Sequence, residues 1–192
     1  MFKTSLYNNK KEFNLKQLFL SHNWGKDNLN RDNHYRVKII GNILKKNGYT
    51  IWLDEFEIKS GNIDHSMLYG INNCECVLVF ITDKYMNKIN NGCENKLFRT
   101  DNCYKEFNYS NIIKKTIIPI LMEPIPELLE KKGLYNFYLG NQLYIDFSND
   151  FNYNKSIKKL IKSLKNNNIY PKNIDNKFNI LSKKKNVSTI YI

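Results

Sequence analysis

The sequence has few of the residues that identify disulfide-bonded, zinc-binding or nucleic-acid-binding proteins. Its four cysteines fit neither a paired disulfide framework nor the two-pair spacing of a structural zinc site, so we expect reduced thiols and no bound metal. Only three of the thirty basic residues are arginine, on which nucleic-acid readers rely for bidentate contacts. Although the net charge of +12 would suit a polyanion, nucleic acid is therefore not expected as the main partner.

Long hydrophobic runs are also absent. No apolar stretch approaches the ~20 residues that span a bilayer, and residues 1–10 lack the apolar core of a secretory signal. The chain also has no glycine-rich phosphate fingerprint. We therefore expect a cytoplasmic protein with no membrane partner.

The composition nevertheless predicts a folded chain. Hydrophobic residues make up 42% of the sequence, with thirteen Tyr and eleven Phe, which is too apolar for intrinsic disorder. A length of 192 residues corresponds to about one domain.

Five short apolar runs have the character of β-strands: 17–21, 49–53, 76–81, 116–122 and 142–145. The third is apolar at every position, which is typical of a central strand covered on both faces. Pro119 removes one backbone donor from the fourth and predicts an edge strand or a local irregularity.

Three segments between or after these runs have the spacing of amphipathic helices. The first is capped by Asp32 or Asn33 and ends at Gly48. The apolar stripes are Val37, Ile40, Gly41 and Leu44; Ile63, Met67, Ile71 and Cys74; and Ile157, Leu160, Ile161 and Leu164. A charged loop at 54–60, with a turn at Gly61, is predicted before the second helix.

This alternation predicts an α/β protein, a flavodoxin-like three-layer fold with a central parallel five-stranded sheet. The domain is expected at residues 16–165, between an N-terminal extension (1–15) and a basic, loosely attached C-terminal extension (166–192). Ligands of such sheets bind beyond the carboxyl ends of the first and third strands. Residues 21–24 should therefore face residues 82–85.

Four segments resemble the Toll/interleukin-receptor (TIR) domain family. Residues 18–22 (LFLSH) are similar to its first box, and residues 48–54 (GYTIWLD) to its second strand and the start of the BB loop. Residues 71–82 resemble its third strand, and residues 103–106 (CYKE) the Cys-x-x-Glu stretch of plant-type members. A bacterial receiver domain has a related fold, but Ser21 and His22 stand where its clustered acids would be.

The resemblance implies cleavage of NAD+ at the nicotinamide–ribose bond, with Glu106 as the catalytic carboxylate. The products would be nicotinamide and ADP-ribose or a cyclic variant, in defence or cell-death signalling. A buried carboxylate would stabilise the positive charge that develops on the ribose, and nicotinamide leaves without protonation. NAD+ would be the substrate with no further cofactor, and other TIR domains would be partners through self-association.

Nine further residues are predicted to bind the substrate: Ser21, His22, Trp24, Lys26, Arg31, Trp52, Thr82, Tyr85 and Cys103. Trp24 could stack on a flat ring, and Lys26 and Arg31 could face the diphosphate. Each has a structural alternative: His22 as a hydrogen-bonded strand end, Trp52 as core and Cys103 as packing.

The functional alternative is a non-enzymatic signalling adaptor that assembles through residues 52–63. In that case Glu106 would be incidental. The structural alternative for Glu106 itself is a solvent-facing helix residue beside Lys105. One departure from the family pattern favours the adaptor, because many active members carry Trp four residues before the glutamate and this chain has Asn102.

Overall fold

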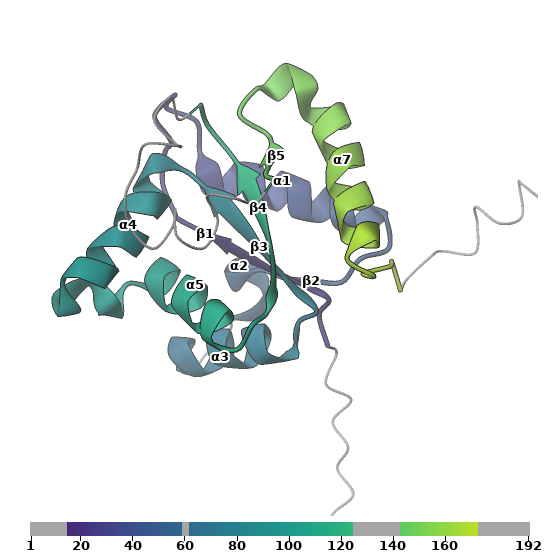
Figure 1. Cartoon of the computed structure of the whole chain (residues 1–192). Helices are drawn as coiled ribbons and strands as arrows, with labels where there is room; N and C mark the ends of the chain where they lie inside the picture. Colours follow the sequence, from purple (N-terminus) through teal and green to yellow (C-terminus); the bar gives the residue numbers. More distant parts are fainter. Residues whose placement is uncertain (1–14, 59–61, 125–142, 173–192) are drawn as a thin grey trace, which may run out of the picture.

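The computed structural model describes residues 15–58, 62–124 and 143–172 (Figure 1). The predicted N-terminal extension before Leu15, the turn at Gly61, the predicted strand residue Gln142 and the chain after Lys172 lie outside the described residues.

A parallel five-stranded sheet forms the middle layer of the molecule. Its strands are β1 (Leu18–His22), β2 (Ile51–Trp52), β3 (Cys76–Ile81), β4 (Thr116–Leu121) and β5 (Ile145–Asp146). Their order, β2-β1-β3-β4-β5, is the flavodoxin-like order. The predicted fold class is thereby confirmed.

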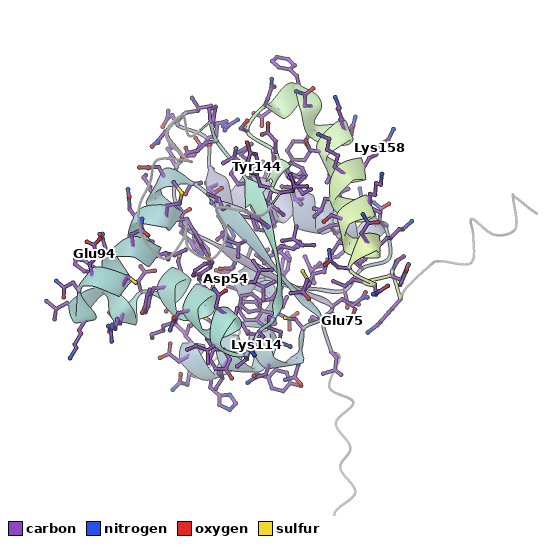
Figure 2. All side chains as sticks on the ribbon, in the orientation of Figure 1. Asp54, Glu75, Glu94, Lys114, Tyr144 and Lys158 are labelled. Atoms are coloured by element: carbon purple, nitrogen blue, oxygen red, sulfur yellow. The ribbon has the colours of Figure 1, made fainter. Side chains whose placement is uncertain are left out.

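Helices cover both faces of this sheet (Figure 1). The first face packs against α1 (Asn33–Lys46) and α7 (Tyr153–Asn166), and the second against α3 (Ile63–Asn73), α4 (Asp83–Glu94) and α5 (Asn102–Ile112). Side chains alternate along each strand, so Leu18 and Leu20 of β1 join the first core and Phe19 the second. On the solvent side, α7 carries lysines such as Lys158 (Figure 2).

The central strand is β3, as its sequence predicts. All six of its residues are buried, and it pairs with β1 on one side and β4 on the other. The predicted helix caps are also present. The Asp32 side chain accepts a hydrogen bond from the Tyr35 N–H, and Gly48 follows α1 with a φ of 88°.

Two segments differ from the sequence expectation. The predicted charged loop after β2 begins with a short helix, α2 (Asp54–Glu57), in which three acidic residues suit the first turn. Ile63, predicted as part of the buried stripe of α3, is 48% exposed because it is the first residue of that helix.

Pro119 is accommodated without moving β4 to the edge of the sheet. β4 pairs with both β3 and β5, so the expectation of an edge strand is wrong. Pairing with β5 begins at Ile120, so Pro119 lies on a stretch of β4 that β5 does not cover. The missing N–H therefore interrupts no bond to β5.

Packing continues beyond Lys165, where the C-terminal extension was expected to begin. Ile169 is buried in the first core, and the carbonyl of Tyr170 accepts a hydrogen bond of 2.6 Å from the Gln17 side chain. Lys172 forms an ion pair with Glu75. Residues 166–172 are thus attached to the start of β1.

Among the described residues, none of the helices combines the length and hydrophobicity that crossing a bilayer requires.

Candidate active site

Glu106 lies on the face of α5 that packs against the sheet. Asp101 caps this helix, since its side chain accepts a hydrogen bond of 2.8 Å from the Cys103 N–H. Only 8% of Glu106 is exposed. The alternative of a solvent-facing Glu106 is therefore wrong.

The carboxylate is held by a chain of hydrogen bonds that begins at α4. The Ser21 hydroxyl donates to Oε2 of Glu106 at 2.6 Å, and the same hydroxyl oxygen lies 2.7 Å from the hydroxyl of Tyr85. Because a serine hydroxyl has one proton, Tyr85 must donate to Ser21 when Ser21 donates to Glu106. The chain fixes the position of the carboxyl group relative to the end of β1.

The surroundings of Glu106 favour its protonated form. Burial raises its pKa to about 8, and the nearby Asp54 and Asp101 carboxylates act in the same direction. The hydrogen bond from Ser21 and the positive charge of Lys88 act against this rise. Such a strongly perturbed carboxyl group in a cavity is a marker of a functional site.

Glu106 lines a cavity of about 320 Å³. The cavity lies beyond the carboxyl end of β1, between α2, α3, α4 and α5, at the position expected for a flavodoxin-like sheet. Its lining residues are His22, Trp24, Asp54, Ile58, Met67, Lys88, Thr100, Asp101, Asn102, Cys103 and Glu106.

Three of the predicted substrate-binding residues line this cavity together with Glu106. Trp24 is 60% exposed, and its indole N–H donates to Oδ2 of Asp54 at 2.6 Å. His22 is buried, and burial lowers the pKa of its imidazole. Cys103 is also buried, which raises the pKa of its thiol and makes it a poor nucleophile.

Ser21 and Tyr85 do not line the cavity, but they hold the Glu106 carboxylate through hydrogen bonds. Thr82 is fully buried and caps α4, with its hydroxyl accepting from the Tyr85 N–H at 3.1 Å and donating to the side chain of Asn23. Trp52 is a core residue, stacked on Phe19 with ring centroids 4.2 Å apart. Trp52 is thus not on the surface that was predicted for assembly.

The two cations predicted for the diphosphate lie elsewhere. Lys26 is exposed and does not line the cavity of Glu106. Arg31 forms an ion pair with Asp27 and donates to the carbonyls of Met122 and Ser148. Its guanidinium therefore stabilises the loop before α1.

The cation that does line the cavity is Lys88 of α4, which sequence reasoning missed. Its ammonium group lies 2.9 Å from the carboxylate of Asp101. The sequence does contain a pattern that predicts α4: Tyr85, Met86 and Ile89 form an apolar stripe, and all three are buried. That stripe would have predicted the helix and placed Lys88 in its second turn.

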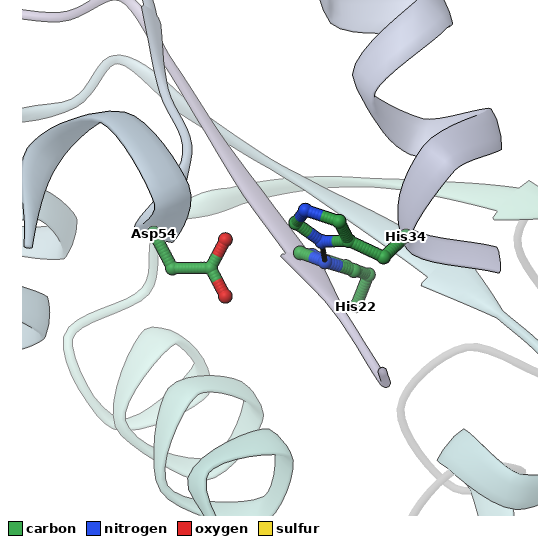
Figure 3. A group of neighbouring side chains, drawn as sticks. All are labelled: His22, His34 and Asp54. Carbon is green, nitrogen blue, oxygen red and sulfur yellow. Dashed lines mark hydrogen bonds between the residues drawn. The ribbon is translucent and has the colours of Figure 1, made fainter. Parts of the chain in front are cut away.

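The described residues also contain one cluster with the composition of a metal site: His22, His34 and Asp54. Nothing in the sequence spacing of these residues predicts it, because they come from three separate elements. Figure 3 shows the Asp54 carboxylate directed toward the two imidazole rings.

Comparison with known proteins assigns the family. A family model described as the TIR domain matches residues 18–161, which is most of the chain. This protein belongs to the TIR domain family. The search among curated proteins gives no significant match.

Two solved structures have the same fold at low sequence identity. One is the TIR domain of the Toll-related receptor TRR-2 from Hydra magnipapillata, 14% identical, with a TM-score of 0.53 over 78% of this chain and 98% of that chain. The other comprises the TIR domains of the activated Roq1 resistosome, which directly recognises the pathogen effector XopQ. It is 16% identical, with a TM-score of 0.55 over 78% of this chain and 99% of that chain.

Proposed function

We propose that this TIR domain cleaves NAD+ into nicotinamide and ADP-ribose or a cyclic variant, with Glu106 as the catalytic carboxylate. The observation that carries the proposal is the buried carboxyl group of Glu106, held by Ser21 at the wall of a cavity. The proposed setting is defence or cell-death signalling.

Cleavage of the nicotinamide–ribose bond requires one carboxylate near the anomeric carbon of that ribose. As the glycosidic bond breaks, positive charge develops on that sugar, and an ionised Glu106 would stabilise it in a site of low dielectric constant. The positive charge of bound NAD+ would itself favour ionisation of the carboxyl group. The raised pKa of free Glu106 is therefore compatible with this role.

The cavity has room for the reacting end of the substrate. Its volume of about 320 Å³ is at the lower end of the range of ligand pockets, ~300–1,000 Å³. We assign it to nicotinamide and its ribose, with the rest of the dinucleotide outside. The exposed Trp24 at the rim offers a ring for stacking, and Lys88 offers a charge for the diphosphate.

We also propose that self-association with other TIR domains precedes activity. The groove between α3 and α5 favours this, because Leu68 and Ile112 are 43% and 66% exposed beside it. The same groove would serve a non-enzymatic adaptor, which is the second candidate function. Asn102, exposed at the rim of the cavity where many active members have Trp, is the residue that favours the adaptor.

Release of nicotinamide from NAD+ tests the proposal. Concentrated full-length protein, with and without a crowding agent, should release nicotinamide, and Glu106→Gln should reduce the rate at least about 100-fold because the charge that stabilises the transition state is lost. Glu94→Gln is the matched control. Glu94 is exposed at the end of α4, does not line the cavity and lies far from Asp54 (Figure 2), so the rate should not change.

Two outcomes would overturn the enzymatic proposal. One is equal release by Glu106→Gln and the parent protein, which would indicate a contaminating activity. The other is no release by protein that sedimentation shows to be assembled, which would leave the adaptor function.

A further inference from the structure

The two histidines beside the Glu106 cavity face each other through ring nitrogens. His22 is the last residue of β1, and His34 is the second residue of α1. Nε2 of His22 lies 2.7 Å from Nδ1 of His34, and the potential ligand atoms of both rings and of Asp54 all lie within 4.8 Å of one another (Figure 3). Three elements that are distant in sequence thus direct nitrogen and oxygen atoms at one point.

Each ring also has an outer nitrogen, Nδ1 of His22 and Nε2 of His34, whose hydrogen-bond partner determines where the proton of the ring lies. Nδ1 of His22 lies 3.2 Å from the carbonyl oxygen of Leu20, and Nε2 of His34 lies 3.1 Å from a carboxylate oxygen of Glu55. A carbonyl and an ionised carboxylate only accept, so each outer nitrogen carries the proton of its neutral ring. The two inner nitrogens are then unprotonated, and their lone pairs face each other.

Two lone pairs at this distance repel unless a proton on one ring or a metal ion lies between them. A metal ion would take both lone pairs and leave both outer hydrogen bonds intact. The cluster also holds the negative charge that an ion with two positive charges requires, because an Asp54 oxygen lies within 4.8 Å of both rings and a Glu55 oxygen lies 3.1 Å from His34. Both Asp54 oxygens retain a free lone pair beside their bonds from Trp24 and the Glu55 N–H.

We propose that Nε2 of His22, Nδ1 of His34 and the carboxylate of Asp54 bind one divalent transition-metal ion, for which Zn²⁺ is the best chemical match. Two imidazoles and one carboxylate are a common zinc ligand set and leave a fourth position for water. Glu55 would hold the ring of His34, as carboxylates do for many zinc-bound histidines. Nitrogens bound to one tetrahedral zinc ion lie about 3.3 Å apart, so binding would separate the rings by roughly half an ångström.

The ion would connect three parts of the chain beside the cavity of Glu106. It would join the end of β1 and the start of α1 to the first residue of α2, and both His22 and Asp54 line the cavity of Glu106. The metal site is nevertheless independent of the proposed function, because its ligand atoms come from His22, His34 and Asp54 and require neither NAD+ nor Glu106.

Zinc binding is measured directly on the full-length protein after treatment with a chelator. Competition with a chromophoric zinc indicator should give one Zn²⁺ per chain, and His34→Ala should weaken binding at least about 100-fold, since removal of outer partners alone costs 10- to 100-fold. Glu55→Gln should weaken it by about 10- to 100-fold. His65→Ala removes the remaining histidine, which is exposed on α3, and should leave the affinity unchanged.

A second measurement identifies the ligands. The visible spectrum of the Co²⁺-substituted protein should show a four- or five-coordinate ion without a thiolate charge-transfer band, and Cys93→Ser should not alter it. Circular dichroism of His34→Ala and Asp54→Asn checks that both variants are folded. In the parent protein Zn²⁺ should raise the Tm, whereas in folded His34→Ala it should not.

The proposal is overturned if no Zn²⁺ binds at one equivalent, if folded His34→Ala binds it as tightly as the parent protein, or if Co²⁺ shows thiolate ligation. None of these readouts uses NAD+, so failure of the zinc site is distinguishable from failure of the enzymatic proposal.

Discussion

At the scale of single residues, Glu106 and its hydrogen-bond partner determine how the site responds to pH. A carboxyl group with a pKa of about 8 is mostly protonated at pH 7, with roughly a tenth of it ionised. Since the proposed chemistry needs the ionised form, the free protein should become more competent as the pH rises.

The pH dependence of kcat/KM for NAD+ follows from this. We expect a rising limb with an apparent pKa near 8, well above the range of an exposed glutamate, because burial is the main cause of the shift. Initial rates between pH 5 and 9.5 at low NAD+ concentration would measure it. A rising limb with an apparent pKa near 4.5 would show that the group whose ionisation limits kcat/KM is not the buried Glu106.

Ser21→Ala serves as the companion variant. The hydrogen bond from Ser21 lowers the pKa of Glu106, so its loss should move the limb to higher pH. It should also reduce the free energy of unfolding by about 1–3 kcal/mol, since the buried hydroxyl of Tyr85 loses its partner. A limb that stays in place would contradict the assignment.

At the scale of helices and strands, the contact between α4 and α5 depends on a small residue. Gly92 of α4 is buried, and a Cβ atom added there would lie 2.3 Å from the ring of Tyr104 on α5. That separation is too short for carbon atoms. The glycine therefore sets how closely α4 approaches the helix that carries Glu106.

Gly92→Ala tests this packing. Alanine gains about 1 kcal/mol in helix propensity over glycine, but overpacking a well-ordered contact costs typically 1–3 kcal/mol. We expect a net loss of about 1 kcal/mol in the free energy of unfolding, measured by urea denaturation. Asn91→Ala, one residue earlier and exposed, is the control and should be neutral or slightly stabilising. A stabilised Gly92→Ala would show that Tyr104 yields easily.

Sequence patterns predicted the elements whose signals are local. β3 was identified from its uninterrupted apolar run, and α1 from its stripe and caps. α4 was missed because Asp, Lys, Asn and Glu make up most of the helix and obscure the stripe of Tyr85, Met86 and Ile89. Glu106 was found through a family motif, whereas the approach of Lys88 and Asp54 depends on tertiary packing that no local pattern encodes.

At the scale of the whole molecule, the end of the described chain closes one core. Ile169 follows α7 and is 3% exposed, packed with residues of the sheet and α1. The nearby bonds from Tyr170 and Lys172 reach the start of β1 and the start of β3. Residues 169–172 therefore pack against the 16–165 unit that helix periodicity suggests.

Ile169→Ala measures what this closure contributes. Removing a fully buried isoleucine side chain costs about 2–5 kcal/mol, and we expect a loss in that range from urea denaturation. Leu97→Ala is the control, because Leu97 is 80% exposed and should change stability by less than about 0.5 kcal/mol. Equal effects of the two variants would mean that Ile169 does not contribute to the core.

At the carboxyl end of β1, adjacent residues face opposite layers: Ser21 faces α5 and donates a hydrogen bond to Glu106, and His22 faces α1 with its ring against that of His34. Natural selection can consequently change one of these positions without repacking the layer that holds the other. Among descendants of a common ancestor, the carboxylate support and the histidine pair should be gained and lost independently. A lineage that abandons one would still inherit the other.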